Sequence, residues 1–229
     1  MRDRHARVAG LLYLLAIVVG WLTLAYLPDR FIVTGDAAAT AQNIAASEAL
    51  FRVTIFGDLV CGTIWLFVVL ALYRLLGGVD RIQGALMVVL GAFMQVPLYF
   101  VNAVNYAAAF VLVTKTDFLS VFSDAQRDAM AMLFLRLHHY ELLASLLFAG
   151  FWLFPFGILV YRSRFLPRTL GVLLAINGFA WVAICASGFL TPQYSGIVST
   201  ITAPMNFGEI AIALWLTIVG AKTLGKARD

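Results

Sequence analysis

The sequence predicts an all-α integral-membrane protein, a bundle of six transmembrane helices. Of its 229 residues, 62% are apolar and only 12% are charged, and the mean hydropathy is +0.93. A soluble domain of this size carries roughly 25% charged residues. Charged residues also divide the chain into apolar runs of about 20 residues, the length that crosses the hydrocarbon core of a bilayer. We therefore expect residues 1–229 to form a single integral-membrane domain.

The spans follow one another along the whole chain. The first is a retained span, because its uncharged run, Val8 to Pro28, is longer than the roughly 7–15 residues of a signal-peptide core. Gly77-Gly78 predicts a tight turn after the second span. The last connection, TPQYSGIVSTITAP, is uncharged and is expected to be a loop. The predicted spans cover residues 8–27, 53–73, 84–112, 138–161, 169–190 and 204–221.

The polar segment between the first two spans predicts a short helix at the membrane interface. It is too long and too rich in alanine for a plain loop, and Thr34 or Asp36 can cap its amino end. Ile44, Ala45 and Leu50 are its less polar positions.

Two further residues predict features of the longer helices. The third uncharged run exceeds the thickness of one bilayer, so it must tilt or protrude, and Pro97 inside it predicts a kink. Ser123 is a candidate cap for the fourth helix.

Basic residues alternate between the two sides of the predicted bundle. Eleven Lys and Arg residues fall on one side and five on the other. The larger group is Arg2, Arg4, Arg7, Arg74, Arg81, Arg162, Arg164, Arg168, Lys222, Lys226 and Arg228, and the smaller group is Arg30, Arg52, Lys115, Arg127 and Arg136. Positive residues remain on the cytoplasmic side, so both termini are predicted to be cytoplasmic. The net charge of +4 therefore reflects topology and does not indicate a nucleic-acid partner.

Polar residues recur at one depth in the predicted spans. Counted from the basic residue at the inner end of each span, they lie about 20–26 Å into the membrane at 1.5 Å per residue. The five spans that contribute are represented by Asp58, Gln95, Ser145, Cys185, and Asn206 with Glu209. The same count places His138 and Glu141 at the outer interface, as an entrance.

Helical spacing places these polar residues on common faces. His138, Glu141 and Ser145 follow an i, i+3, i+7 pattern. Gln95, Tyr99, Asn102 and Tyr106 share a face of the third helix, and Asn206 and Glu209 share a face of the sixth. An intramembrane carboxylate is costly unless it faces a partner or water, so Asp58 and Glu209 should point inward. The pattern predicts an outward-facing polar pocket.

Each candidate residue also has a structural interpretation. Asp58 and Glu209 are candidates to bind a cation, to transfer protons or to act as an acid/base pair, and the structural alternative is a hydrogen bond between helices. His138 and Glu141 resemble half of a metal site, although the chain has no H-E-x-x-H motif, and proton handling is the other role for the histidine. Arg136 is an interfacial anchor or an anion-binding residue. Trp21, Tyr26 and Tyr106 fit an aromatic belt.

Several classes of site are not indicated. The two cysteines, Cys61 and Cys185, lie in apolar runs and form no C-x-x-C motif. The chain has no phosphate-binding loop, nucleophile elbow or dinucleotide fingerprint. With three histidines it cannot ligate two stacked hemes, and no lysine lies inside a span to form a Schiff base. The sequence indicates no cofactor.

Four blocks of the chain resemble a bacterial membrane family, domain of unknown function 4386. They are ARVAGLLYLLAIVVG, PDRFIVTGDAAATAQNIAASEALFR with the following FGDLV, YRSRFLPRTLGVLLAINGFAW, and GEIAIALWLTIVG. The blocks include Asp58 and Glu209. The resemblance implies a multi-pass protein of the bacterial cytoplasmic membrane, and it supplies no catalytic residue.

The leading functional hypothesis is a membrane protein whose outer-half pocket binds or transports a small amphipathic molecule, a lipid or a cation. One alternative is a membrane-embedded enzyme that acts on a lipid-like substrate by acid/base or metal-assisted chemistry. Another is a subunit or scaffold of a membrane complex, in which the polar layer serves only packing.

Overall fold

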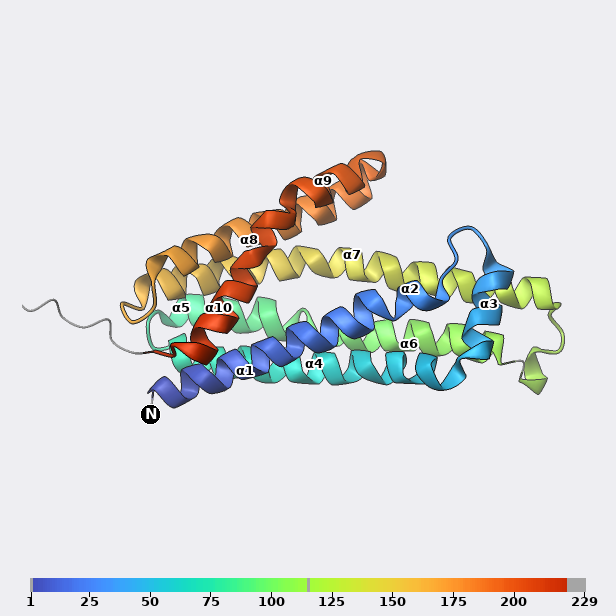
Figure 1. Cartoon of the computed structure of the whole chain (residues 1–229), viewed down its shortest axis with the longest axis horizontal. Coiled ribbons are helices and arrows are strands. Elements are labelled where there is room, and N and C mark those ends of the chain that lie inside the picture. Colours follow the sequence, from blue (N-terminus) through green and yellow to red (C-terminus); the bar gives the residue numbers. More distant parts are fainter. Residues whose placement is uncertain (1, 115, 222–229) are drawn as a thin grey trace, which may run out of the picture. The chain divides into compact units, whose positions relative to one another are not determined.

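The computed structural model describes residues 2–114 and 116–221, and the described residues fold into helices joined by short connections (Figure 1). Six helical stretches in this part of the chain are long and apolar enough to cross a membrane. They are Arg2–Phe31, Glu48–Leu76, Arg81–Val113, Asp124–Arg162, Arg168–Leu190 and Pro192–Ile218. The predicted all-α fold with six spanning helices is confirmed. Four of the basic residues that predict the orientation lie outside the described residues: Lys115, Lys222, Lys226 and Arg228.

Three of the six spans are built from more than one helical segment. The first joins α1 (Arg2–Gly20), the π-helical turn η1 (Trp21–Tyr26) and α2 (Pro28–Phe31). The single-segment helices are α3 (Ala37–Ala46), α4 (Glu48–Leu76), α7 (Asp124–Arg162) and α8 (Arg168–Leu190). The third span consists of α5 (Arg81–Val88), the π-turn η2 (Val89–Phe93) and α6 (Val96–Val113), with η3 (Asp117–Leu119) after it. The last consists of η4 (Pro192–Tyr194), α9 (Ser195–Thr202), η5 (Ala203–Asn206) and α10 (Phe207–Ile218).

The predicted helix caps are present in the structure. Asp36 caps α3, because its Oδ1 accepts a hydrogen bond from the Ala39 amide at 2.9 Å. Ser123 caps α7 with a bond from the Gln126 amide at 3.3 Å, and the Gln126 side chain accepts from the Ser123 amide at 2.8 Å. This reciprocal pair is a capping box. Leu50, expected in the interfacial helix, belongs instead to α4.

The third span is interrupted beside Pro97, as predicted. The π-turn η2 and two turn residues end one helix, and Pro97 is the second residue of α6. Proline is tolerated there because the first amides of a helix have no intrahelical acceptor.

The prediction of a loop at TPQYSGIVSTITAP was wrong, because residues 192–206 are helical. Pro192 occupies the first turn of the segment, a position that proline favours. The hydroxyl groups of Thr200 and Thr202 donate hydrogen bonds to backbone oxygens four residues earlier. These side chains therefore do not compete with the helix for its backbone groups. Backbone polar groups within a bilayer must be satisfied internally, which also favours helix over an open loop.

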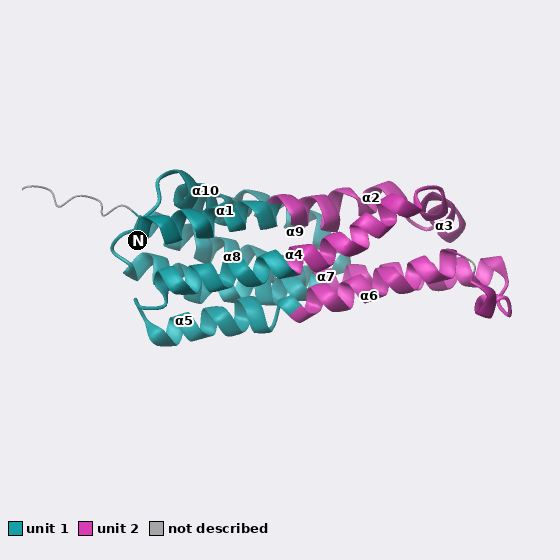
Figure 2. Ribbon diagram, turned by 90° about the horizontal axis from the view of Figure 1, so that it is seen from below, with its two compact units in different colours: residues 1–17, 63–96, 143–229 teal, residues 18–62, 97–142 magenta. Residues whose placement is uncertain are grey.

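The helices pack as two compact units (Figure 2). Unit 1 lies within residues 1–17, 63–96 and 143–229, and unit 2 within residues 18–62 and 97–142. The long helices α4 and α7 contribute residues to both units.

Unit 1 has an aromatic core and a close contact between α7 and α8. Trp152 is fully buried, with its ring 5.0 Å from that of Trp65 and 5.2 Å from that of Phe156. Gly150 faces Gly178 so closely that a Cβ on either would lie 2.6–2.8 Å from the carbonyl oxygen of the other. Gly157 and Gly171 repeat this arrangement two turns away. Small residues allow such close backbone approach in membrane helices.

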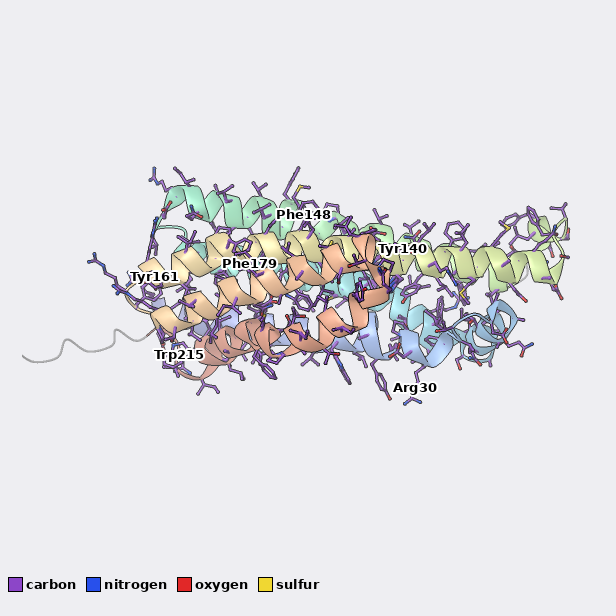
Figure 3. The ribbon with its side chains drawn as sticks, turned by 90° about the horizontal axis from the view of Figure 1, so that it is seen from above. Arg30, Tyr140, Phe148, Tyr161, Phe179 and Trp215 are labelled. Atoms are coloured by element: carbon purple, nitrogen blue, oxygen red, sulfur yellow. The ribbon has the colours of Figure 1, made fainter. Side chains whose placement is uncertain are left out.

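Unit 2 has a separate apolar core around Phe51 of α4. The Phe51 ring lies 5.2 Å from that of Phe31, 5.4 Å from that of Tyr106 and 5.9 Å from that of Phe110. The short helix α3 lies across the direction of α4 and buries Ile44 in this core (Figure 1). The Arg30 side chain extends away from the ribbon (Figure 3), with its guanidinium group 5.0 Å from the Tyr26 ring.

Candidate functional site

A buried carboxylate and an imidazole meet inside unit 2. Asp58 of α4 is 0% exposed, and its Oδ2 lies 3.4 Å from Nε2 of His138 on α7. Its Oδ1 is also buried and has no hydrogen-bond partner. Thr23 lies beside this carboxyl group, but its hydroxyl donates to the Val19 oxygen at 3.1 Å. Asp58 is therefore only partly satisfied.

His138 is held flat against Tyr106 of α6. The two rings are stacked with centroids 3.7 Å apart and planes 22° apart, and both residues are almost fully buried. The Tyr106 hydroxyl has no hydrogen-bond partner. Three helices of unit 2, α4, α6 and α7, thus bring an aspartate, a histidine and a tyrosine to one place.

Glu141 lies almost one helical turn after His138 and is only half-buried. Its Oε2 accepts a hydrogen bond from Asn105 Nδ2 at 3.0 Å. In the orientation of its carboxamide that pairs donors with acceptors, Asn102 Nδ2 donates to the same oxygen at 3.0 Å and to the His138 carbonyl at 3.3 Å. Polar side chains therefore continue from the buried pair to a half-buried carboxylate.

Glu209 of α10 has a different environment, inside unit 1. Its Oε1 accepts from the Tyr13 hydroxyl at 2.5 Å, and its Oε2 accepts from Trp181 Nε1 at 2.8 Å. Asn177 accepts from the Glu209 amide at 3.1 Å and donates to Asn206 Oδ1 at 3.3 Å. Both carboxylate oxygens have a donor, so this cluster has the character of an interhelical connection.

Gln95 also has a structural role in unit 1. Its Nε2 donates to the Leu90 carbonyl at 3.2 Å and to the Phe148 carbonyl at 3.4 Å (Phe148 is labelled in Figure 3). The Leu90 carbonyl belongs to the π-turn before Pro97. The Gln95 side chain therefore provides a hydrogen-bond donor to a backbone carbonyl oxygen at the break in the third span.

The predicted residues fall into two groups. Within unit 2 the structure brings Asp58, Asn102, His138 and Glu141 together, and Tyr99 packs against Gly62 of α4. The predicted residues in unit 1 are Gln95, Ser145, Asn206 and Glu209. Arg136 is exposed.

Two predictions about position were wrong. His138 was expected nearer the outer end of the spans than Asp58, but the two side chains are in contact, with Nε2 of His138 3.4 Å from Oδ2 of Asp58. The axial count assumed straight helices that start at one plane, and inclined helices do not keep such a register. Tyr106 was expected in an aromatic belt, but it is 1% exposed and stacks on His138.

Sequence reasoning missed the partners of Glu209. Tyr13 and Trp181 have no fixed spacing relative to Glu209, and an aromatic residue in a span is usually a packing or belt residue. Asn105 lies next to the face that carries Asn102 and is the one partner that the polar pattern of α6 could have suggested. Among the described residues, no three His, Cys, Asp or Glu side chains lie close enough together to share a metal ion.

The two carboxylates should respond differently to neutralisation. Glu209→Gln leaves one of two donors without an acceptor, which costs about 1–3 kcal/mol of stability. Asp58→Asn keeps an acceptor for His138 and removes a buried charge, so it should be at least as stable as the wild type. Thermal unfolding in one detergent measures both, with Asp117→Asn as an exposed control. Equal losses in Asp58→Asn and Glu209→Gln would contradict the distinction.

Comparison with known proteins gives a family but no activity. An uncharacterized protein of Archaeoglobus fulgidus is 35% identical to this chain over 78 residues, which is 33% of this chain. The match covers 44% of that relative, less than half of its length. No solved structure matches the chain significantly. The model of the family named domain of unknown function (DUF4386) matches residues 8–220, and the chain therefore belongs to this family of unknown function.

Proposed function

We propose that this multi-pass membrane protein binds a small amphipathic cation and exchanges it for a proton at Asp58, with His138 as the proton partner. The observation that carries the proposal is the fully buried Asp58 carboxyl group, which has a histidine at one oxygen and no partner at the other. Such a group can hold a proton or a cation. It cannot hold both without leaving a net charge in the membrane.

The cost of charge in a bilayer supports this role. A charged side chain at the centre of a span costs on the order of a few kcal/mol, and such residues mark ion and proton pathways. The imidazole of His138, at 3.4 Å from Asp58 Oδ2, is placed to exchange a proton with this carboxyl group. Glu141, one turn away and half-buried, offers a carboxylate between this pair and the surface of unit 2.

Aromatic rings beside the pair support an amphipathic cation. Tyr106 stacks on His138 and also contacts Phe51, which in turn contacts Phe31 and Phe110. Aromatic faces attract cations and also bury apolar groups. Because Asp58 is fully buried, binding requires α4, α6 and α7 to separate at this point.

We further propose that the protein is a single domain of the bacterial cytoplasmic membrane with both termini in the cytoplasm. The excess of basic residues at one end of the spans supports this orientation. The family relationship and the six apolar helices support the location.

Reporter fusions test the orientation. Alkaline phosphatase, which is active only outside the cytoplasm, should be active when fused after Leu119 or Ser195, because few basic residues flank these connections. Fusions after Val79 or Ser163, in the basic connections, should be inactive. Activity at Ser163, or its absence at Leu119, would contradict the orientation.

Ethidium flux tests the exchange. Proteoliposomes containing the full chain and an acidic interior should accumulate ethidium from a neutral medium, because protons leaving through Asp58 drive the cation inward. Asp58→Asn should reduce uptake to that of protein-free vesicles, and Asp117→Asn, an exposed change of the same chemistry, should not. The proposal fails if wild-type vesicles take up no more ethidium than empty ones, or if Asp58→Asn matches the wild type.

A further inference from the structure

An apolar groove lies on the surface of unit 2 between α4 and α6. Its volume is about 290 Å³, near the lower end of the ~300–1,000 Å³ typical of small-molecule sites. The lining residues are Arg52, Ile55, Phe56, Leu59, Ala107, Phe110 and Val111. On α4 they follow an i, i+3, i+4, i+7 spacing and on α6 an i, i+3, i+4 spacing, so each helix presents one face.

The charged group of this groove is at one end. Arg52 is four residues from the start of α4, and Leu59, at the other end, is about 10 Å further along the helix. The Arg52 side chain is 64% exposed, and its guanidinium carbon lies 4.5 Å from the centre of the Phe110 ring. The Oε2 atom of Glu48 lies 4.0 Å from Nη2 of Arg52, which is the upper limit for an ion pair. Stacking orients the guanidinium plane and leaves N–H donors along its edge for an anion.

The membrane determines what can occupy such a groove. The groove lies between two helices of candidate spanning length, so we expect hydrocarbon around its apolar walls. Water has no polar partner along its apolar walls, so an acyl chain is the component of the bilayer that fills it. At the charged end, the exposed guanidinium group can pair with a phosphate through two parallel hydrogen bonds. It favours a headgroup of net negative charge, because a zwitterionic headgroup carries its own cation beside the phosphate.

We propose that this groove is a binding site for an anionic phospholipid, with one acyl chain between α4 and α6 and the phosphate on Arg52. Leu59 and Ala107 of the groove directly follow Asp58 and Tyr106 in the sequence. A bound lipid would therefore brace the two helices at the level of the buried pair. The proposal does not depend on proton exchange at Asp58, because it rests on a different face of these helices.

Native mass spectrometry of the purified full chain tests the site. The probes are phosphatidylglycerol and phosphatidylcholine with identical acyl chains, titrated separately. The wild type should prefer phosphatidylglycerol, and Arg52→Gln should weaken its binding about fivefold, the effect of one basic residue on an anionic lipid. The binding of phosphatidylcholine should weaken less, because the choline ammonium group already balances the charge of its phosphate. Ala107→Leu fills the groove without changing charge and should weaken the binding of both lipids.

Arg30 provides a matched control. It is exposed in the same unit and stacks on Tyr26 as Arg52 stacks on Phe110, but it lines no part of the groove. Arg30→Gln should leave the preference for phosphatidylglycerol intact. The site is refuted if Arg30→Gln and Arg52→Gln reduce that preference equally, if Arg52→Gln leaves it unchanged, or if Ala107→Leu binds both lipids as tightly as the wild type.

Discussion

The contact between Asp58 and His138 joins α4 to α7 where a charge is hardest to solvate. Burial of an ionised carboxylate without compensation costs far more than one hydrogen bond returns. A single nitrogen at 3.4 Å offsets only part of that cost, and Oδ1 is left without a donor. Protonation of Asp58 removes the remainder, because a neutral carboxyl group is far less costly to bury than a carboxylate. The aromatic core of unit 2 around Phe51 contacts Tyr106, which stacks on His138 and so holds the imidazole in place.

Glu209 shows how the same fold treats a carboxylate that serves packing. Tyr13 and Trp181 each donate to one of its oxygens, and Asn177 binds its backbone. Nothing in this arrangement gains from a further ligand. The difference between the two carboxylates therefore lies in their hydrogen-bond partners, and it is the basis for assigning exchange to Asp58 and interhelical packing to Glu209.

Composition and charge were sufficient to predict the helical class, the six spans, the cap at Asp36 and the break near Pro97. Each of these depends on local chemistry or on the length of an apolar run. The helix at residues 192–206 was missed because an uncharged, turn-rich segment resembles a loop until the membrane requires its backbone to be satisfied. The partners of Glu209 were missed because they come from distant segments, and axial counting fixes neither tilt nor rotation. Spacing on a single helix could only show which residues share a face.

Infrared difference spectroscopy between acidic and alkaline buffers tests the central claim, that Asp58 gains and loses a proton in the folded protein. In lipid nanodiscs, the wild type should show a carboxylic C=O stretching band that changes with pH. Because other carboxyl groups of the chain also titrate, the component that belongs to Asp58 is the one that should disappear in Asp58→Asn. That component should shift in His138→Gln because the partner of the carboxyl group is altered. An unchanged band in Asp58→Asn would contradict the claim.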